Sequence, residues 1–136
     1  MPAGYSGTPL IKKLGIKPGY SIMPVNEPDH YFDLLGELPD EVRVVPHTAS
    51  GPVDFIHLFA ADEQTLHNYL LPLKGKLDKD GSFWVSWIKG SSKFKTDING
   101  NEVRHLGLGI GLVDVKVCAV DEDWSALKFM YRREDR

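Results

Sequence analysis

A loop rich in cations and hydroxyls is the part of this sequence best suited to bind a ligand. Residues 89–95 (KGSSKFK) bring together three ammonium groups, two hydroxyls and a glycine. Exposed amides of such a turn can hold an anion, with the lysines as point charges beside it. The sequence therefore predicts an anion site at Lys89, Ser91, Ser92 and Lys93. The loop does not match the phosphate-binding pattern GxxxxGK[ST], and a mobile, solvated connection is the alternative interpretation.

Two further side chains are candidates to join this site. Trp87 lies three positions after Trp84, so the two indoles should point to opposite faces of a strand. Trp87 can line a pocket beside Lys89, or pack in the core with its indole donor satisfied. Lys116 would complete a basic pocket if it pointed into a cleft with Lys89. If its strand borders the sheet, Lys116 and Asp114 face solvent instead.

Nucleophiles and metal ligands are sparse in the sequence. Cys118 is the single cysteine, has no histidine close in sequence, and is interpreted as an inert small hydrophobe. His57 lies between apolar residues and is expected to be a hydrogen-bonded core side chain. No histidine pair has the spacing of a metal site and no GxSxG motif occurs, so we predict no bound metal and identify no catalytic residue.

Strand-like and helix-like segments alternate along the chain. Strands are expected over residues 20–25, 42–45, 53–60, 82–88, 113–120 and 124–131. The first expected helix is capped by Thr8, begins at Pro9 and stops at Gly15, and the second covers about residues 29–38. The third runs from a cap at Asp62 through Leu77, and the fourth begins at a capping pair of Asn99 and Glu102. Pro72 should kink its helix, and residues 80–81 (DG) should form a turn.

These elements predict one α/β domain over residues 1–136, with residues 1–18 as a helical segment packed on it. Strands separated by helices imply right-handed crossovers and a largely parallel sheet between two helical layers. The last two strands are too close in sequence for a crossover helix, so they must form an antiparallel hairpin. A Rossmann-like sheet ending in such a hairpin is the topology of the S-adenosylmethionine-dependent methyltransferase fold.

Three separated segments carry a resemblance to a known family. Residues 5–16 (YSGTPLIKKLGI), 83–92 (FWVSWIKGSS) and 111–129 (GLVDVKVCAVDEDWSALKF) resemble a small bacterial family catalogued as domain of unknown function 3052. The resemblance extends over nearly the whole chain. It implies a stand-alone, cytoplasmic, Rossmann-like domain, and it supplies no activity, cofactor or site residue.

The turn after the first strand differs from a nucleotide-cofactor turn, which needs glycines so that the backbone can approach the ligand. Residues 25–30 (VNEPDH) contain no glycine, and Glu27 and Asp29 add negative charge. The acid expected after the second strand, for ribose hydroxyls, is replaced by residues 45–47 (VPH). Only seven residues, 46–52, precede the next strand, too few for the usual extra helix–strand–helix. The sequence thus predicts a reduced, non-catalytic methyltransferase-like scaffold without cofactor.

Composition limits the partners and the compartment. The net charge of -3 argues against a nucleic-acid binder, and the lone cysteine points to a reducing compartment. The longest uncharged apolar run, residues 106–113, is far shorter than the about 20 residues that span a bilayer. No secretory signal is evident, so a cytoplasmic location is expected.

The predicted role is binding of a protein partner or a small anionic ligand. The alternative is an enzyme or nucleotide- or phosphometabolite-binding protein that uses residues 89–95.

Overall fold

The apolar runs of the sequence become the strands of a six-stranded sheet with the order β2-β1-β3-β4-β6-β5. The computed structural model describes residues 8–136. The strands are β1 (Ser21–Val25), β2 (Arg43–Val44), β3 (Val53–Ala60), β4 (Leu77–Ile88), β5 (Leu112–Ala119) and β6 (Trp124–Tyr131). The first four are parallel, and β6 runs antiparallel to both β4 and β5. The predicted parallel sheet ending in an antiparallel hairpin is therefore confirmed.

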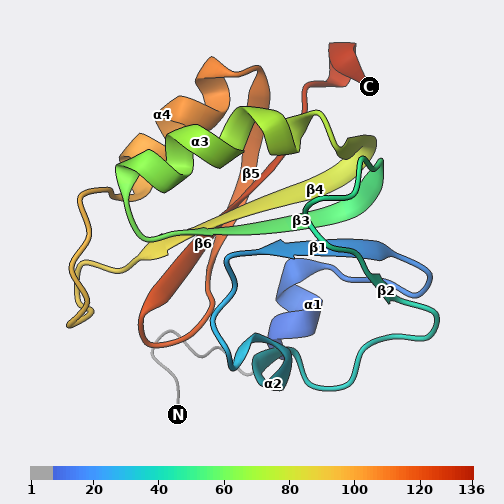
Figure 1. Cartoon of the computed structure of the whole chain (residues 1–136), viewed down its shortest axis with the longest axis horizontal. Helices are drawn as coiled ribbons and strands as arrows, with labels where there is room; N and C mark the ends of the chain where they lie inside the picture. Colours follow the sequence, from blue (N-terminus) through green and yellow to red (C-terminus); the bar gives the residue numbers. More distant parts are fainter. Residues whose placement is uncertain (1–7) are drawn as a thin grey trace.

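Helices cover both faces of the sheet (Figure 1). The short helices α1 (Leu10–Leu14) and α2 (Tyr31–Leu35) pack on one face, and the longer α3 (Glu63–Lys74) and α4 (Gly100–Gly109) pack on the other. A short 3-10 turn, η1 (Arg133–Asp135), follows β6. Within residues 8–136, no helix is both long and apolar enough to cross a membrane.

Alternation along the central strands separates the core into two layers. On β3, Ile56 and Leu58 face α3 and α4, while Phe55 and Phe59 face α1 and α2. Trp84 lies with the second group and its indole N–H donates to the Leu14 carbonyl at 3.0 Å, which holds α1 against the sheet. Residues 8–18 of the predicted N-terminal segment thus include a helix docked on the sheet, and residues 1–7 lie outside the described part.

Most helix ends follow the capping chemistry in the sequence. The Asp62 carboxylate accepts from the Thr65 N–H at 2.7 Å, and the Asn99 amide oxygen accepts from the Glu102 N–H at 3.0 Å. Gly15 ends α1 with a φ of 77°. The predicted cap at Thr8 is wrong: Pro9 occupies the N-cap and makes no side-chain bond.

Several other element boundaries differ from the sequence prediction, most of all those of α2, α3 and β4. Helix α2 is shorter than predicted because Gly36, with a φ of 72°, already ends it. Helix α3 ends at Lys74, two residues after Pro72, so Leu77 belongs to β4. The turn predicted at residues 80–81 is a bulge inside β4: Val53 pairs with Leu77 and Phe55 with Ser82, so the residues between lie opposite Asp54 alone.

Regular alternation along β5 would place Asp114 and Lys116 on the same face of the sheet, but the structure places them on opposite faces. β5 borders the sheet as expected. A bulge shifts the register between Asp114, which pairs with Phe129, and Lys116, which pairs with Lys128. Asp114 consequently lies on the α4 face, where its carboxylate accepts from the Arg104 Nε at 3.0 Å. Lys116 lies on the opposite face, because the extra residue at the bulge inverts the sides of the residues that follow.

Candidate functional site

The predicted anion loop, residues 89–95, is fastened to the turn between β5 and β6. The Lys89 N–H donates to the Asp123 carbonyl, and the Ser92 hydroxyl donates to the Asp123 carboxylate, both at 2.8 Å. Ser91 and Lys93 are exposed, and the Lys93 ammonium lies 5.6 Å from the Phe94 ring centroid. Of the predicted loop candidates, Ser92 is therefore used in an internal bond, while Ser91 and Lys93 are presented to solvent.

Thr96 and Asp97, which follow this loop, are hydrogen-bonded to the backbone at the start of α3. The Thr96 hydroxyl donates to the Ala61 carbonyl at 2.8 Å, and the Asp97 carboxylate accepts from the Glu63 N–H at 2.7 Å. The connection from β4 to α4 is thus anchored at both of its ends.

Trp87 packs against the first turn of α4. Its partly buried indole lies against the core of the α3–α4 face, opposite to Trp84, so the predicted opposite orientation of the two indoles is confirmed. A Cβ at Gly100 would lie 2.8 Å from the Trp87 ring, so glycine is needed there for the helix to approach the indole. This contact matches the packing role foreseen for Trp87, and its ligand-binding role stays a prediction.

Lys116 lines a surface cavity of about 430 Å³ beside α1. We call it the lysine cavity; its lining consists of Thr8, Lys12, Lys13, Lys116, Val117, Cys118 and Ala119. No residue of the 89–95 loop belongs to this lining, so Lys116 and the loop are parts of different surfaces. Sequence reasoning missed the two lysines of α1, because they lie about one hundred positions from Lys116 and meet it only through the packing of α1 on the sheet.

Cys118 lies in the same cavity with a partly exposed thiol. Burial raises the pKa of the Cys118 thiol, while the nearby ammonium groups of Lys13 and Lys116 act to lower it. Because burial is the larger effect, the thiol is stabilised in its neutral form. This agrees with the interpretation of Cys118 as unreactive, since the thiolate is the nucleophile.

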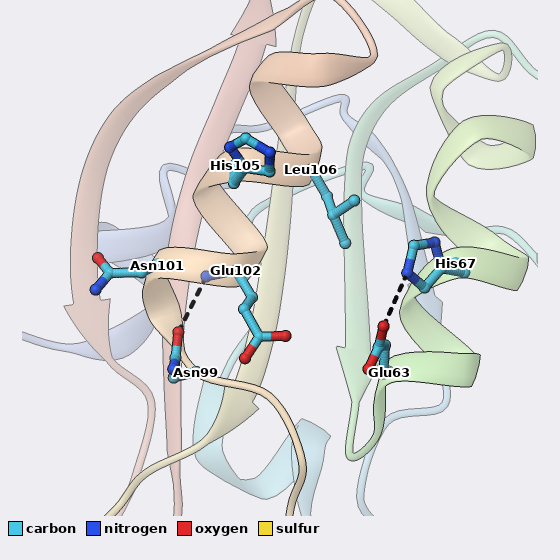
Figure 2. Close-up of a pocket in the computed structure, with 7 residues that line it drawn as sticks. All are labelled: Glu63, His67, Asn99, Asn101, Glu102, His105 and Leu106. Atoms are coloured by element: carbon cyan, nitrogen blue, oxygen red, sulfur yellow. Dashed lines mark hydrogen bonds and ion pairs between the residues drawn. The ribbon is translucent and has the colours of Figure 1, made fainter.

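A second cavity, of about 570 Å³, lies between the first turns of α3 and α4 (Figure 2). Glu63 and His67 on α3 form an ion pair at 3.4 Å and face Glu102 and Leu106 on α4. The sequence analysis predicted none of these residues for a binding site and named Glu102 only as part of a helix cap. Across residues 8–136 no three His, Cys, Asp or Glu side chains are grouped so that they could hold a metal ion.

His57 is the centre of a buried hydrogen-bonded chain. Its Nδ1 lies 3.0 Å from the Tyr31 hydroxyl and its Nε2 lies 2.7 Å from the Ser86 hydroxyl. The ring also stacks on Phe59, with centroids 4.3 Å apart. A neutral imidazole can satisfy both bonds, with one nitrogen donating and the other accepting. The expectation of a hydrogen-bonded core histidine is confirmed.

The hydrogen-bonded side chains of Tyr31, His57 and Ser86 resemble a base beside a nucleophile, but they are not accessible to a substrate. His57, Ser86 and Tyr31 are all completely buried between the sheet and α2. Burial lowers the pKa of His57 to about 3 and, together with Glu27, raises the pKa of the Tyr31 hydroxyl. Each group is therefore held neutral, and these three hydrogen-bonded side chains act as a polar part of the core.

The turn after β1, where this type of sheet holds a nucleotide cofactor, has side chains at the positions where such a cofactor turn has glycines. Asn26 takes the left-handed conformation, with a φ of 57°, where a glycine would be usual. At the next helix start, the His30 Nε2 lies 2.9 Å from the Asp121 carboxylate of the β5–β6 turn. Asp121 in turn accepts from the N–H groups of Asp123 and Trp124. The two turns are thus bonded to each other.

The chain after β2 goes directly to β3 without a further strand. The Val45 N–H donates to the Ile22 carbonyl at 2.8 Å, and Val45 and Ala49 pack on the α3–α4 face of the core. The Lys76 ammonium contacts the His47 carbonyl on this connection. No carboxylate stands at the end of β2, because residues 45–52 (VPHTASGP) contain no acid. This connection therefore supplies no carboxylate that could bind the hydroxyls of a ribose.

Comparison with known proteins identifies the fold. No protein-family model and no curated protein matches the chain. An S-adenosylmethionine-dependent methyltransferase from Aquifex aeolicus is similar, with a TM-score of 0.63 at 16% identity over 90% of this chain and 88% of that one. The DhpI–SAH complex has a TM-score of 0.63 at 9% identity, covering 92% and 83% of the two chains. A TehB-like methyltransferase from Corynebacterium glutamicum reaches 0.56 at 10% identity, covering 90% and 85%. At these identities the likeness establishes a methyltransferase-like, Rossmann-like fold.

Proposed function

We propose that this chain is a non-catalytic methyltransferase-like module that acts by binding a small anionic ligand and does not use S-adenosylmethionine. One observation carries the proposal: the carboxyl edge of the sheet, where open α/β sheets bind ligands, is closed by bonds between its own loops. In the β5–β6 turn, Asp121 is hydrogen-bonded to His30 of the β1–α2 turn, and Asp123 is hydrogen-bonded to Ser92 of the β4–α4 loop.

The chemistry of the β1–α2 turn supports the same conclusion. A bound adenosyl cofactor needs close approach of backbone amides, which glycines permit and side chains oppose. Glu27 and Pro28 occupy that position half-buried, and Asp29 adds a second carboxylate. The scaffold also lacks the strand and helices that would follow β2, so the part of the site that would surround the adenine is not built.

An anionic ligand is favoured because the lysines of the lysine cavity are close together and form no ion pair with an acidic residue of the described part of the chain. The lysine cavity holds three lysines, and among residues 8–136 no carboxylate lies within 4.0 Å of any of them. We infer further that the chain belongs to the bacterial family catalogued as domain of unknown function 3052 and works in the cytoplasm, which its single cysteine supports.

A second candidate function is nucleotide or phosphometabolite binding through residues 89–95. The anchoring of this loop at Asp123 favours it, because Ser91 and Lys93 are presented from a fastened backbone and lose less entropy on binding. In that case Lys93→Ala should weaken binding of a phosphorylated metabolite while variants of the lysine cavity leave it unchanged.

The deciding experiment measures S-adenosylmethionine binding to the purified full-length chain by calorimetry and by thermal stabilisation. A ligand at about one hundred times its Kd stabilises the folded state by about 2.7 kcal/mol, so a shift of the melting temperature is easily detected. We expect no heat of binding and no shift. A measurable Kd that weakens in a Glu27→Lys variant, or methyl transfer to any acceptor, contradicts the proposal.

A further inference from the structure

Five lysines gather where α1 lies against the β5–β6 hairpin. Lys12 and Lys13 extend from α1, Lys17 follows it, Lys116 belongs to β5 and Lys128 to β6. Three of them line the lysine cavity, and Lys17 and Lys116 act electrostatically on Lys128. Segments far apart in sequence thus place their positive charges on one surface of a chain whose net charge is -3.

The centre of this surface is a like-charge pair built into the sheet. Lys116 and Lys128 are direct cross-strand partners in the antiparallel register, so their side chains leave the sheet on the same face. The pair two positions along, Cys118 with Ala126, leaves the sheet on the same face and packs in the core layer of α1, which identifies that face as the α1 side. Burial lowers the pKa of Lys128, and the ammonium groups of Lys116 and Lys17 lower it further.

These five lysines form no ion pair with another residue of the described range 8–136. The ion pairs of the described residues involve His30, His67 and Arg104, and none involves a lysine of this cluster. The remaining residues 1–7 (MPAGYSG) contain no Asp or Glu. Like charges directly opposite each other on paired strands are destabilising, so the arrangement leaves a site that a bound anion would stabilise.

We propose that the lysine cavity binds a small molecule through a diphosphate or triphosphate group. Its volume of about 430 Å³ lies within the range of small-ligand pockets, which is about 300–1,000 Å³. Several converging ammonium groups match several phosphate charges better than a single carboxylate, and lysine is a frequent phosphate ligand. The concave, local distribution of charge on an acidic chain favours a small molecule over a nucleic acid. This assignment rests on the proposed function and names the class of its ligand.

Cys118 supplies a local reporter, because it is the single cysteine of the chain and lines the cavity. The experiment follows alkylation of Cys118 by iodoacetamide in the full-length protein, with and without inorganic pyrophosphate or adenosine diphosphate, at constant ionic strength. Because burial raises the pKa of this thiol, the reaction is run at a fixed alkaline pH of about 9, where a larger share of the thiol is ionised and can react. At about ten times the Kd of the probe, alkylation should be roughly tenfold slower, since about a tenth of the cavities stay empty. Sodium chloride at equal ionic strength is the control for screening.

Two charge-matched double variants separate a site from general electrostatics. Lys116→Met with Lys128→Met should abolish the protection, whereas the control, Arg43→Met with Arg133→Met, removes two exposed charges elsewhere and should retain it. Equal protection in both variants, or none in the wild type, overturns the assignment. Protection by a single-stranded oligonucleotide but not by either phosphate probe also overturns it.

The comparison of the two probes identifies the source of the phosphate group. Protection by adenosine diphosphate at lower concentration than pyrophosphate indicates a nucleotide, and the reverse order indicates an inorganic or other phosphate chain; either result supports the site. Binding of S-adenosylmethionine to both the wild type and the Lys116→Met, Lys128→Met variant would contradict the proposed function while leaving the protection of Cys118 as evidence for this cavity.

Discussion

The buried His57 should make the stability of the protein fall as the solution is acidified. Burial lowers the pKa of His57 from its ordinary value of 6.5 to about 3. Below pH 6.5 the unfolded chain therefore binds a proton that the folded chain does not, so the free energy of unfolding decreases by about 1.4 kcal/mol per pH unit. Between about pH 6.5 and pH 5 the loss is about 2 kcal/mol, and above pH 6.5 this contribution is fully present.

Urea unfolding over this pH range measures the effect, and two core variants isolate its source. His57→Gln removes the titrating group, so the change of the free energy of unfolding with pH should become smaller by about 1.4 kcal/mol per pH unit. Ser86→Ala removes the 2.7 Å hydrogen bond to Nε2 but keeps the imidazole, so it should lower stability by about 1 kcal/mol at every pH and retain the slope.

The imidazole resonances of His57 provide a second measurement on the wild type. They should show no protonation down to about pH 5, because the folded-state pKa lies well below that value. A His57 ring that titrates near pH 6, or a His57→Gln protein with the wild-type slope, would refute the account of this group as a neutral core side chain. Either result would also reopen a catalytic reading of the His57 and Ser86 pair.

Two further predictions concern packing and charge. Gly107→Ala should destabilise the protein by about 1–3 kcal/mol because the new methyl would overlap the buried ring of Phe129. Gly109→Ala in the same helix meets no atom within 4 Å and should be neutral or stabilise by up to about 1 kcal/mol in the same urea titration. Lys116→Met should raise the melting temperature at low salt by relieving about 0.2–1 kcal/mol of repulsion with Lys128, and the gain should shrink at high salt. A gain that is equal at high and low salt would assign it to packing instead.

The strands that could be predicted are those whose side-chain pattern alone determines their limits. The predicted ranges of β3 (Val53–Ala60) and β6 (Trp124–Tyr131) agree with the structure at both ends. β3 is apolar on both faces and bounded by a proline and by the Asp62 cap, so local chemistry defines it. The antiparallel pairing of the last two strands followed from the shortness of their connection, which no crossover helix could fit.

The features that could not be predicted depend on tertiary contacts. Gly81 suggests a turn in isolation, but it is buried in β4 because its backbone lies close to the Asp54 carbonyl, where a Cβ would be 2.9 Å away. The bulge before Lys116 likewise leaves no pattern in the sequence, yet it decides which face that lysine occupies. The lysine cavity needs the bulge and the docking of α1 together, so neither segment indicates the site alone.

The proposed function requires that a methyltransferase-like fold persist without a cofactor site. Stability of this architecture comes from the two apolar layers of the sheet, which involve strands and helices, while a cofactor site is made from loops at the carboxyl edge. Here the carboxylates of the β5–β6 turn, Asp121 and Asp123, bind the loops that follow β1 and β4. The edge that would have bound a ligand therefore stabilises the fold. The lysines around the edge strand β5 lie outside that network, and they are the charges that we propose to bind an anionic ligand.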